Sequence, residues 1–210
     1  MKAVYLVIVL FLMVGCSSTR MVDSWKSQEY TNYKPKKVLI VGMTDNLTAR
    51  MQFEEQLTSE FKDSGIEAMG SSDVFEPSFT NVKQTEDDIN TELAKISKDG
   101  FDAVLISAVK GVDEKETYSG TTYRPGYYWK RFGRYYYLYQ DVYFDDGYYE
   151  KYKVYHIEAS LYNIKENNDK SLVWVASYDI VDPKQINTTV KDYVKVIMKS
   201  LSEEGFVDTK

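Results

Sequence analysis

Cysteine is nearly absent from this 210-residue chain, and a single one, Cys16, excludes any disulfide within the chain. Histidine also occurs once, as His156, so zinc sites built from clusters of His and Cys are excluded. The apolar run at residues 3–14 is too short to cross the roughly 30 Å core of a bilayer, because a spanning helix needs about 20 apolar residues. The net charge of −6 argues against nucleic acid and against a polybasic membrane-binding face, since both need a basic surface.

The lone cysteine lies at the end of that apolar run. Lys2 precedes the run, which finishes in Met13-Val14-Gly15-Cys16, and the whole segment resembles a bacterial lipoprotein signal. The sequence therefore predicts that residues 1–15 are a cleaved signal peptide. It also predicts that Cys16 is acylated and that palmitate is among its acyl chains. Removing Lys2 changes the net charge from −6 to −7 and leaves 195 residues, enough to bury one full core. Acylation of the only thiol excludes thiol redox chemistry.

The residues after Cys16 indicate location. Ser17, Ser18 and Thr19 follow without an aspartate, which by resemblance to the sorting rule of diderm bacteria favours the outer membrane, with the domain facing the periplasm. Residues 16–36 are polar and predict a tether. Trp25 and Tyr30 within it are large enough to dock on the fold. Residues 37–210 are then a single domain.

The first half of that domain has the pattern of an α/β fold. Two continuous apolar runs, 38–41 and 103–106, are typical of strands covered on both faces. Between them lie two amphipathic helices, 47–63 with Met51, Phe53, Leu57 and Phe61 on one stripe and 87–98 with Ile89, Leu93 and Ile96, and a short strand over 66–69. This order predicts a parallel strand-helix-strand core. A last strand over 172–178 and a C-terminal helix over roughly 184–204 complete a mixed sheet.

A tyrosine-rich insert, residues 113–150, interrupts this pattern. Thirteen of the 19 tyrosines lie between Tyr118 and Tyr155. Asp146-Gly147 is a strong hairpin turn signal, so we expect a long antiparallel hairpin in which opposing residue numbers sum to 293 and Tyr135 faces Glu158. Its core face continues through Tyr155, Ile157, Ala159 and Leu161. Its other face carries the candidate partner-binding or ligand-binding residues, Tyr135, Tyr137, Tyr139, Tyr143 and Tyr152. Buried packing, a flexible insert and an exposed aromatic surface all remain open.

Other positions give weaker chemical signals. His156 and Glu158 share a strand face, but a solvated neighbour of tyrosine explains the histidine better than a metal or acid-base role. Ser107 lies in an apolar strand without a nucleophile elbow. The turn over residues 41–46 follows a strand and opens a helix, where α/β folds bind phosphates, yet it has one glycine and fits an ordinary turn capped by Asp45 or Asn46. We expect no catalytic residue, no metal and no cofactor.

Several segments together resemble a family of uncharacterised lipoproteins of the Bacteroidota. They are the lipobox, residues 22–25 (Val-Asp-Ser-Trp), residues 37–41 and 50–54, the tyrosine-rich insert, Leu172-Val173-Trp174 and Asp182-Pro183. The strand-helix core is more loosely similar to envelope lipoproteins of the curli-secretion and TolB amino-terminal type. Those resemblances imply an accessory or assembly module without an established activity, and the second one is a fold-level analogy.

Three functions compete. The first is a non-catalytic outer-membrane lipoprotein that contacts an envelope partner through the aromatic hairpin and the membrane through the lipid on Cys16. The second is a glycan-binding or peptidoglycan-binding lipoprotein that uses the same tyrosines as stacking platforms. The third is an enzyme with a carboxylate site. We expect the first.

Overall fold

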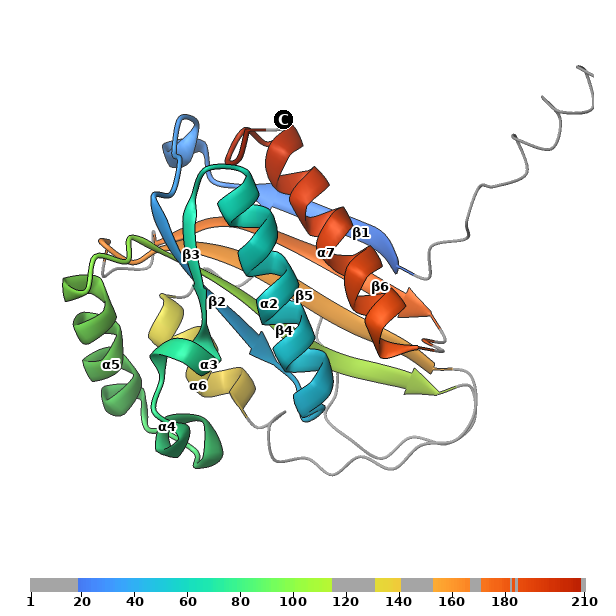
Figure 1. Ribbon diagram of the computed structural model, residues 1–210, viewed down its shortest axis with the longest axis horizontal. Helices are drawn as coiled ribbons and strands as arrows, with labels where there is room; N and C mark the ends of the chain where they lie inside the picture. The colour runs from blue at the N-terminus through green and yellow to red at the C-terminus, as the bar shows by residue number, and fades with distance from the viewer. Residues whose placement is uncertain are drawn as a thin grey trace, which may run out of the picture.

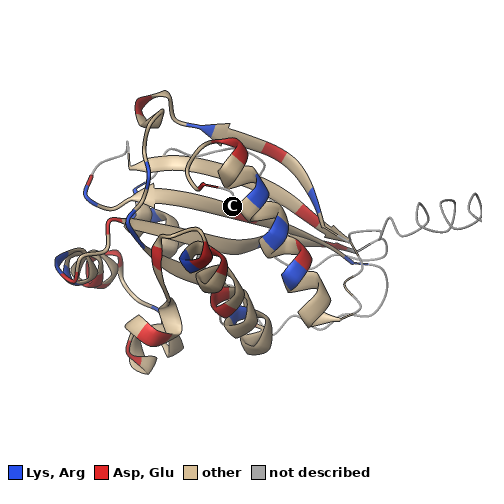
Figure 2. Ribbon diagram, turned by 45° about the horizontal axis from the view of Figure 1, so that its top comes forward, with Lys and Arg blue, Asp and Glu red and all other residues tan. Residues whose placement is uncertain are grey.

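The computed structural model describes residues 19–114, 131–140, 153–166, 171–181, 183 and 185–208. The described elements follow in the order β1 (Thr19–Lys26), η1 (Gln28–Tyr30), β2 (Lys37–Met43), α2 (Leu47–Asp63), β3 (Glu67–Gly70), α3 (Ser71–Val74), α4 (Pro77–Asn81), α5 (Glu86–Lys98), β4 (Ala103–Glu114), α6 (Phe132–Tyr139), β5 (Lys153–Asn163), β6 (Leu172–Val181) and α7 (Ile186–Glu203). The charged residues gather on the helices, on β1 and in connections (Figure 2).

The described strands form one six-stranded mixed sheet in the order β1-β6-β5-β4-β2-β3 (Figure 1). β2 pairs in parallel with β3 and β4, whereas the pairs β4-β5, β5-β6 and β6-β1 are antiparallel. The predicted parallel strand-helix-strand core is therefore confirmed, with an antiparallel half added to it. Within this half, β6 and β5 are each paired on both edges.

Helices cover both faces of the sheet. On one face, α2 and α7 bury Leu57 and Ile197 against Ile40 and Leu105. On the opposite face, α5 and α6 pack with the residues that alternate with these, such as Leu39 and Ile106. The central strands are thus buried on both sides, which explains why their sequences show no polar alternation.

Local sequence signals set the helix boundaries. Thr85 and Asp88 form the capping box of α5, each side chain accepting a hydrogen bond from the other's backbone N–H. Asn46 caps α2 by accepting from the Ala49 N–H at 3.0 Å. Both helices are followed by glycine with positive φ, 81° at Gly65 and 94° at Gly100. The predicted helix ends are confirmed.

The buried stripe of α2 differs from the prediction. Its buried residues are Phe53, Glu54, Leu57 and Phe61, whereas Met51 is 54% exposed. Met51 lies one turn from the start of α2. Glu54 instead occupies the place in the buried stripe where Met51 was expected. A carboxylate in this position requires hydrogen-bond partners, described below.

The expected tether, residues 16–36, is folded from Thr19 onward. β1 occupies the sheet edge beside β6, and Ser27 continues the contact by donating its backbone N–H to the Val173 carbonyl at 2.9 Å. Trp25 and Tyr30 pack against the two core clusters, as their size suggested. The tether interpretation therefore does not hold for residues 19–36, because backbone pairing with β6 fixes this polar segment.

The prediction of a first hairpin strand is wrong over residues 132–139. This segment is the helix α6, so Tyr135 and Tyr137 are not strand neighbours on one face. The second strand exists as β5, and Ala159 and Leu161 face the α2-α7 core as expected, but its partners are β4 and β6. The turn at Asp146-Gly147 lies outside the described residues. Helical spacing explains α6, since Phe132, Tyr135 and Tyr136 are buried and Arg131, Arg134 and Tyr137 are exposed.

Candidate functional site

The candidate binding tyrosines do not share one face, because α6 turns Tyr135 and Tyr137 to different sides. Tyr135 is buried, with 4% of its surface exposed, whereas Tyr137 is 41% exposed and its ring lies 5.4 Å from the Arg134 guanidinium carbon. Tyr139 ends the same helix, and its side chain lies outside the described residues. Tyr143, Tyr152 and the lipidation residue Cys16 lie outside them as well.

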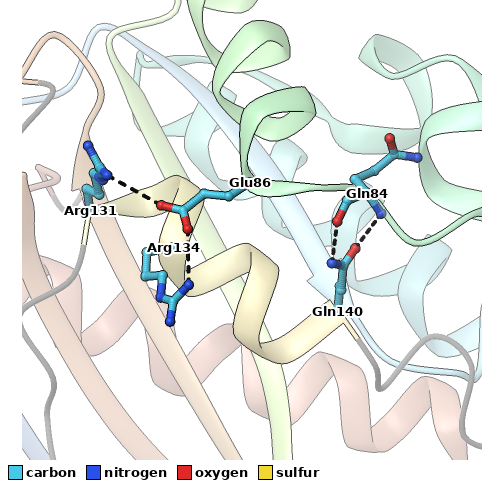
Figure 3. Close-up of polar contacts among 5 residues, drawn as sticks. All are labelled: Gln84, Glu86, Arg131, Arg134 and Gln140. Atoms are coloured by element: carbon cyan, nitrogen blue, oxygen red, sulfur yellow. Dashed lines mark hydrogen bonds and ion pairs between the residues drawn. The ribbon is translucent and has the colours of Figure 1, made fainter.

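Polar contacts dock α6 onto the start of α5 (Figure 3). Glu86 accepts from Arg134 at 3.1 Å and from Arg131 at 3.4 Å. At the other end of α6, the Gln140 amide accepts from the Gln84 backbone N–H at 2.9 Å and donates to the Gln84 carbonyl at 2.7 Å, as a strand partner would. These contacts orient α6 so that Tyr135 faces the sheet.

Tyr135 belongs to a row of polar groups on the sheet face that α6 covers, which we call the polar row: Lys110, Tyr135, Glu158, His156, Asp113 and Asp179. The Tyr135 hydroxyl donates to Glu158 Oε1 at 2.7 Å. Lys110 Nζ lies 3.3 Å from the same oxygen and 5.0 Å from the Tyr135 ring centre. The predicted contact between Tyr135 and Glu158 therefore exists, but a helix side chain makes it.

A register shift places the lysine in the polar row. β4 and β5 pair continuously to Val109 and resume at Gly111, so Lys110 is the extra residue of a β-bulge. Only 6% of the Lys110 side chain and 10% of the Glu158 side chain are exposed. A buried carboxylate and a buried ammonium need each other, because either one alone would be an uncompensated charge.

His156 forms the other half of the polar row. Its Nδ1 lies 2.7 Å from Asp179 Oδ1 on β6, and its Nε2 lies 3.1 Å from Asp113 Oδ2 on β4. Burial alone would lower the pKa of His156, but its hydrogen bonds with Asp113 and Asp179 and their negative charges outweigh burial and raise that pKa above the ordinary 6.5. The imidazolium suits this place because both ring nitrogens can then donate.

A second buried carboxylate, Glu54, lies at the carboxyl ends of β2 and β3. Its Oε1 accepts from the Gly42 N–H at 3.0 Å and from the Ser71 hydroxyl at 2.6 Å. Its Oε2 accepts from both the backbone N–H and the hydroxyl of Ser72, at 3.1 and 3.0 Å. Gly70 allows this approach, because a Cβ there would be 3.2 Å from Glu54 Cβ. Glu54 therefore joins α2, β2 and α3.

The remaining candidates from the sequence have structural roles. Ser107 bonds to the buried hydroxyl of Tyr193 on α7 at 2.8 Å, so it is not placed as a nucleophile. The turn after β2 supplies the cap of α2 through Asn46, as the ordinary-turn interpretation predicted.

Sequence reasoning missed Lys110, Asp113, Asp179 and the role of Glu54. For Lys110, Asp113 and Asp179 the available signal was a charged residue inside a mostly apolar strand. That signal could not show which strands are neighbours of β5, and the pairing is what brings Asp113 and Asp179 to His156.

The polar row contains titratable and charged groups, but its described members contact one another rather than point together toward a place where a substrate could bind. Within the described residues, no three side chains of His, Cys, Asp or Glu are placed to bind a metal ion. Among the helices of the described ranges, none is both long and apolar enough to span a bilayer.

Comparisons with known proteins yield distant similarities. No protein-family model and no curated protein matches the chain. A PelC dodecamer from Paraburkholderia phytofirmans is 12% identical, the alignment covers 89% of this chain and 95% of that one, and the TM-score is 0.42. A second PelC dodecamer from that organism is 11% identical, the alignment covers 85% of this chain and 94% of that one, and the TM-score is 0.40. Lipoprotein GNA1162 from Neisseria meningitidis is 12% identical, the alignment covers 80% of this chain and 99% of that one, and the TM-score is 0.41. Similarities of this size carry no argument about function.

Proposed function

We propose that this protein is a non-catalytic lipoprotein of the outer membrane, anchored through Cys16, that binds an envelope partner through the exposed side of α6. The observation that carries the proposal is the start of the fold. Thr19 is already part of the sheet, as the register partner of Ile180 on β6. Cleavage before Cys16 would leave β1 complete, with the lipid-accepting residue three positions before its first residue.

The exposed side of α6 supports a partner-binding role. Tyr137 keeps 41% of its surface exposed, and the Arg134 guanidinium lies over its ring. Tyrosine and arginine are the residue types enriched at binding hot spots. Because α6 is held by Glu86 and by the Gln84-Gln140 pair, this side chain pair is presented on a fixed element. This surface replaces the hairpin face that the sequence predicted.

The pairing within the polar row supports a non-catalytic protein. Tyr135, Lys110 and Glu158 contact one another, and His156 contacts two carboxylates. A general base or nucleophile must reach a substrate, and these groups are used in joining β4, β5, β6 and α6. The glycan-binding alternative is weakened because Tyr135, one of its stacking platforms, is buried. The resemblance to Bacteroidota lipoproteins stays a prediction.

One experiment on the full chain tests both parts of the proposal. Cys16→Ser should abolish fatty-acid labelling and release the protein from the membrane fraction, whereas Ser17→Ala should do neither. In the lipidated protein, Tyr137→Ala should weaken capture of a discrete envelope protein about tenfold, with unfolding unchanged within about 0.5 kcal/mol. Leu47→Ala, at an apolar residue of α2 that is 57% exposed, is the control.

Each outcome is informative. Label retained in Cys16→Ser would reject the lipid anchor. Equal capture by Tyr137→Ala and the control would reject the α6 surface. Binding to glycans that Tyr137→Ala removes, without any captured protein, would favour the second hypothesis.

A further inference from the structure

The last four residues of β4, 111–114, are held on one side only, and we call them the β4 tip. β2 pairs with β4 as far as Ala108, whereas β5 pairs with β4 to its end at Glu114. The bulge at Lys110 separates the tip from the rest of β4. Among the described strands, β5 is therefore the single neighbour of the tip. A strand end with one neighbour opens more readily than the interior of a sheet.

The part of β5 that faces the tip is held more firmly. Residues 154–156 pair with residues 179–181 of β6 on one edge and with the tip on the other. Opening at this end of the sheet would therefore release the tip and leave β5 paired with β6.

His156 connects three strands at this place. Its Nδ1 lies 2.7 Å from Asp179 Oδ1 on β6, and its Nε2 lies 3.1 Å from Asp113 Oδ2 in the tip. An imidazolium can donate from both nitrogens, so it can hold both carboxylates. A neutral imidazole has one N–H and directs a lone pair from its other nitrogen. Loss of the proton therefore breaks one of the two contacts.

The geometry identifies the contact that is lost. The contact with Asp179 is the shorter one, this side chain is 31% exposed, and Arg20 is its register partner on β1. The contact with Asp113 is longer, and this side chain is 70% exposed, so water can solvate its carboxylate after release. The neutral ring is therefore expected to keep its proton on Nδ1, where it donates to Asp179.

The other titratable or charged groups around this face of the sheet are engaged elsewhere. They are Glu158 on β5, Lys110 on β4, Tyr135 on α6 and Arg20 on β1. The first three contact one another, and Arg20 is beside Asp179. Glu114 and Lys153, the next register pair, point to the opposite face, because successive side chains of a strand alternate. Among the described residues, His156 is thus the cation that is paired with Asp113.

We propose that His156 is a proton-controlled latch for the β4 tip: the imidazolium holds Asp113 and keeps residues 111–114 on the sheet, and the neutral ring keeps Asp179 and releases Asp113. The pKa of His156, raised above 6.5, agrees with two carboxylates that stabilise the charged ring. The latch is closed below 6.5 and opens as pH rises through the folded-state pKa. The chain enters the tyrosine-rich insert through the tip, so the latch sets how firmly this entry is held to the sheet.

Amide hydrogen exchange of the full chain tests the latch, with Asp113→Asn compared with the parent at the same pH. At about pH 5.5, the variant should exchange the amides of residues 111–114 at least about threefold faster, because the latch of the parent is closed. At about two pH units above the folded-state pKa of His156, measured by NMR, both proteins should exchange these amides equally, because the latch is open in both. Asp73→Asn, at an exposed aspartate of α3, is the control and should match the parent at both pH values.

The ring nitrogens identify which carboxylate is released. Above the folded-state pKa, nitrogen NMR of the single histidine should show the proton on Nδ1. A proton on Nε2 would overturn the inference, because the ring would then keep Asp113. Equal exchange of the tip in Asp113→Asn and the parent at both pH values would also overturn it, and so would an equally large difference at both.

Discussion

The imidazole of His156 contacts Asp113 and Asp179 on its two neighbouring strands, so its protonation is coupled to the pairing of β4, β5 and β6. Its ring is the only imidazole in the chain, which makes its titration directly observable. The other charged groups near it are Glu158 and Lys110, which bind each other, and Arg20, the register partner of Asp179. Asp113 and Asp179 therefore provide the attraction that raises the pKa.

We predict that stability falls as pH rises through the folded-state pKa of His156. This pKa is raised above 6.5, so the folded protein binds the proton more tightly than the unfolded chain. The stabilisation is complete below the unfolded value and lost above the folded one. Denaturant unfolding at a series of pH values, with the NMR titration of the single imidazole, measures both.

The matched variant is Asp179→Asn, which keeps the shape of the side chain and removes its charge. It should lower the pKa of His156 and flatten the pH dependence of unfolding. A folded-state pKa of His156 at or below 6.5 in the parent protein would contradict this coupling of protonation to strand pairing, and so would an Asp179→Asn curve that superimposes on the parent curve.

α6 is a helix where the sequence predicted a strand. Residues 135–137 are three consecutive tyrosines, so neither an alternating nor a helical pattern stands out from the composition. The tertiary contacts decide: Glu86 binds the two arginines at the start of α6, Gln84 binds Gln140 at its end, and Phe132 and Tyr136 fill the core beside α5.

The close packing of α5 and α6 gives a prediction whose sign depends on background. A Cβ at Gly133 would collide with Asn90 Oδ1 on α5. Gly133→Ala should therefore displace the Asn90 amide and destabilise the parent by about 1 kcal/mol, because this amide is the far end of a side chain that can turn away. In an Asn90→Ala background the collision is gone, and Gly133→Ala should stabilise by up to about 1 kcal/mol through helix propensity.

A double-mutant cycle in denaturant measures this coupling. The control is Gly65→Asn at a helix C-terminus that has open space around it, which should show no dependence on Asn90. Equal effects of Gly133→Ala in the two backgrounds would mean that α6 does not pack against Asn90.

At the scale of the whole molecule, the sheet carries two cores, one on each face, and β2 contributes to both. Ile40 is fully buried with α2 and α7, and its neighbour Leu39 is fully buried on the other face. The fold therefore depends on β2 as a shared layer.

We predict that Ile40→Asp unfolds the protein. An unpaired buried carboxylate costs several kcal/mol, against a total stability of roughly 5–15 kcal/mol for a domain. Far-UV circular dichroism and thermal melting measure the effect. Val82→Asp, at a residue that is 61% exposed, should melt like the parent within about 0.5 kcal/mol of unfolding free energy. A cooperative, parent-like melt of Ile40→Asp would show that β2 is not in the core.

The sequence by itself determined the elements that carry their own signal. The apolar runs of β2 and β4, the capping box at Thr85, the glycine after α2 and the stripe of α7 depend on residues close together in the chain, so their patterns are readable. The parallel half of the sheet followed from their order.

The tertiary structure alone decided what depends on residues far apart in the chain. β1 exists because β6 supplies its hydrogen bonds, and α6 exists because α5 and β5 receive its aromatic side chains. The polar row needs the bulge at Lys110 and the pairing of β5 with β4 and β6, which together place Asp113 and Asp179 at His156. Long-range pairing is not encoded in local periodicity, because the free energy that selects it comes from contacts between segments rather than within them.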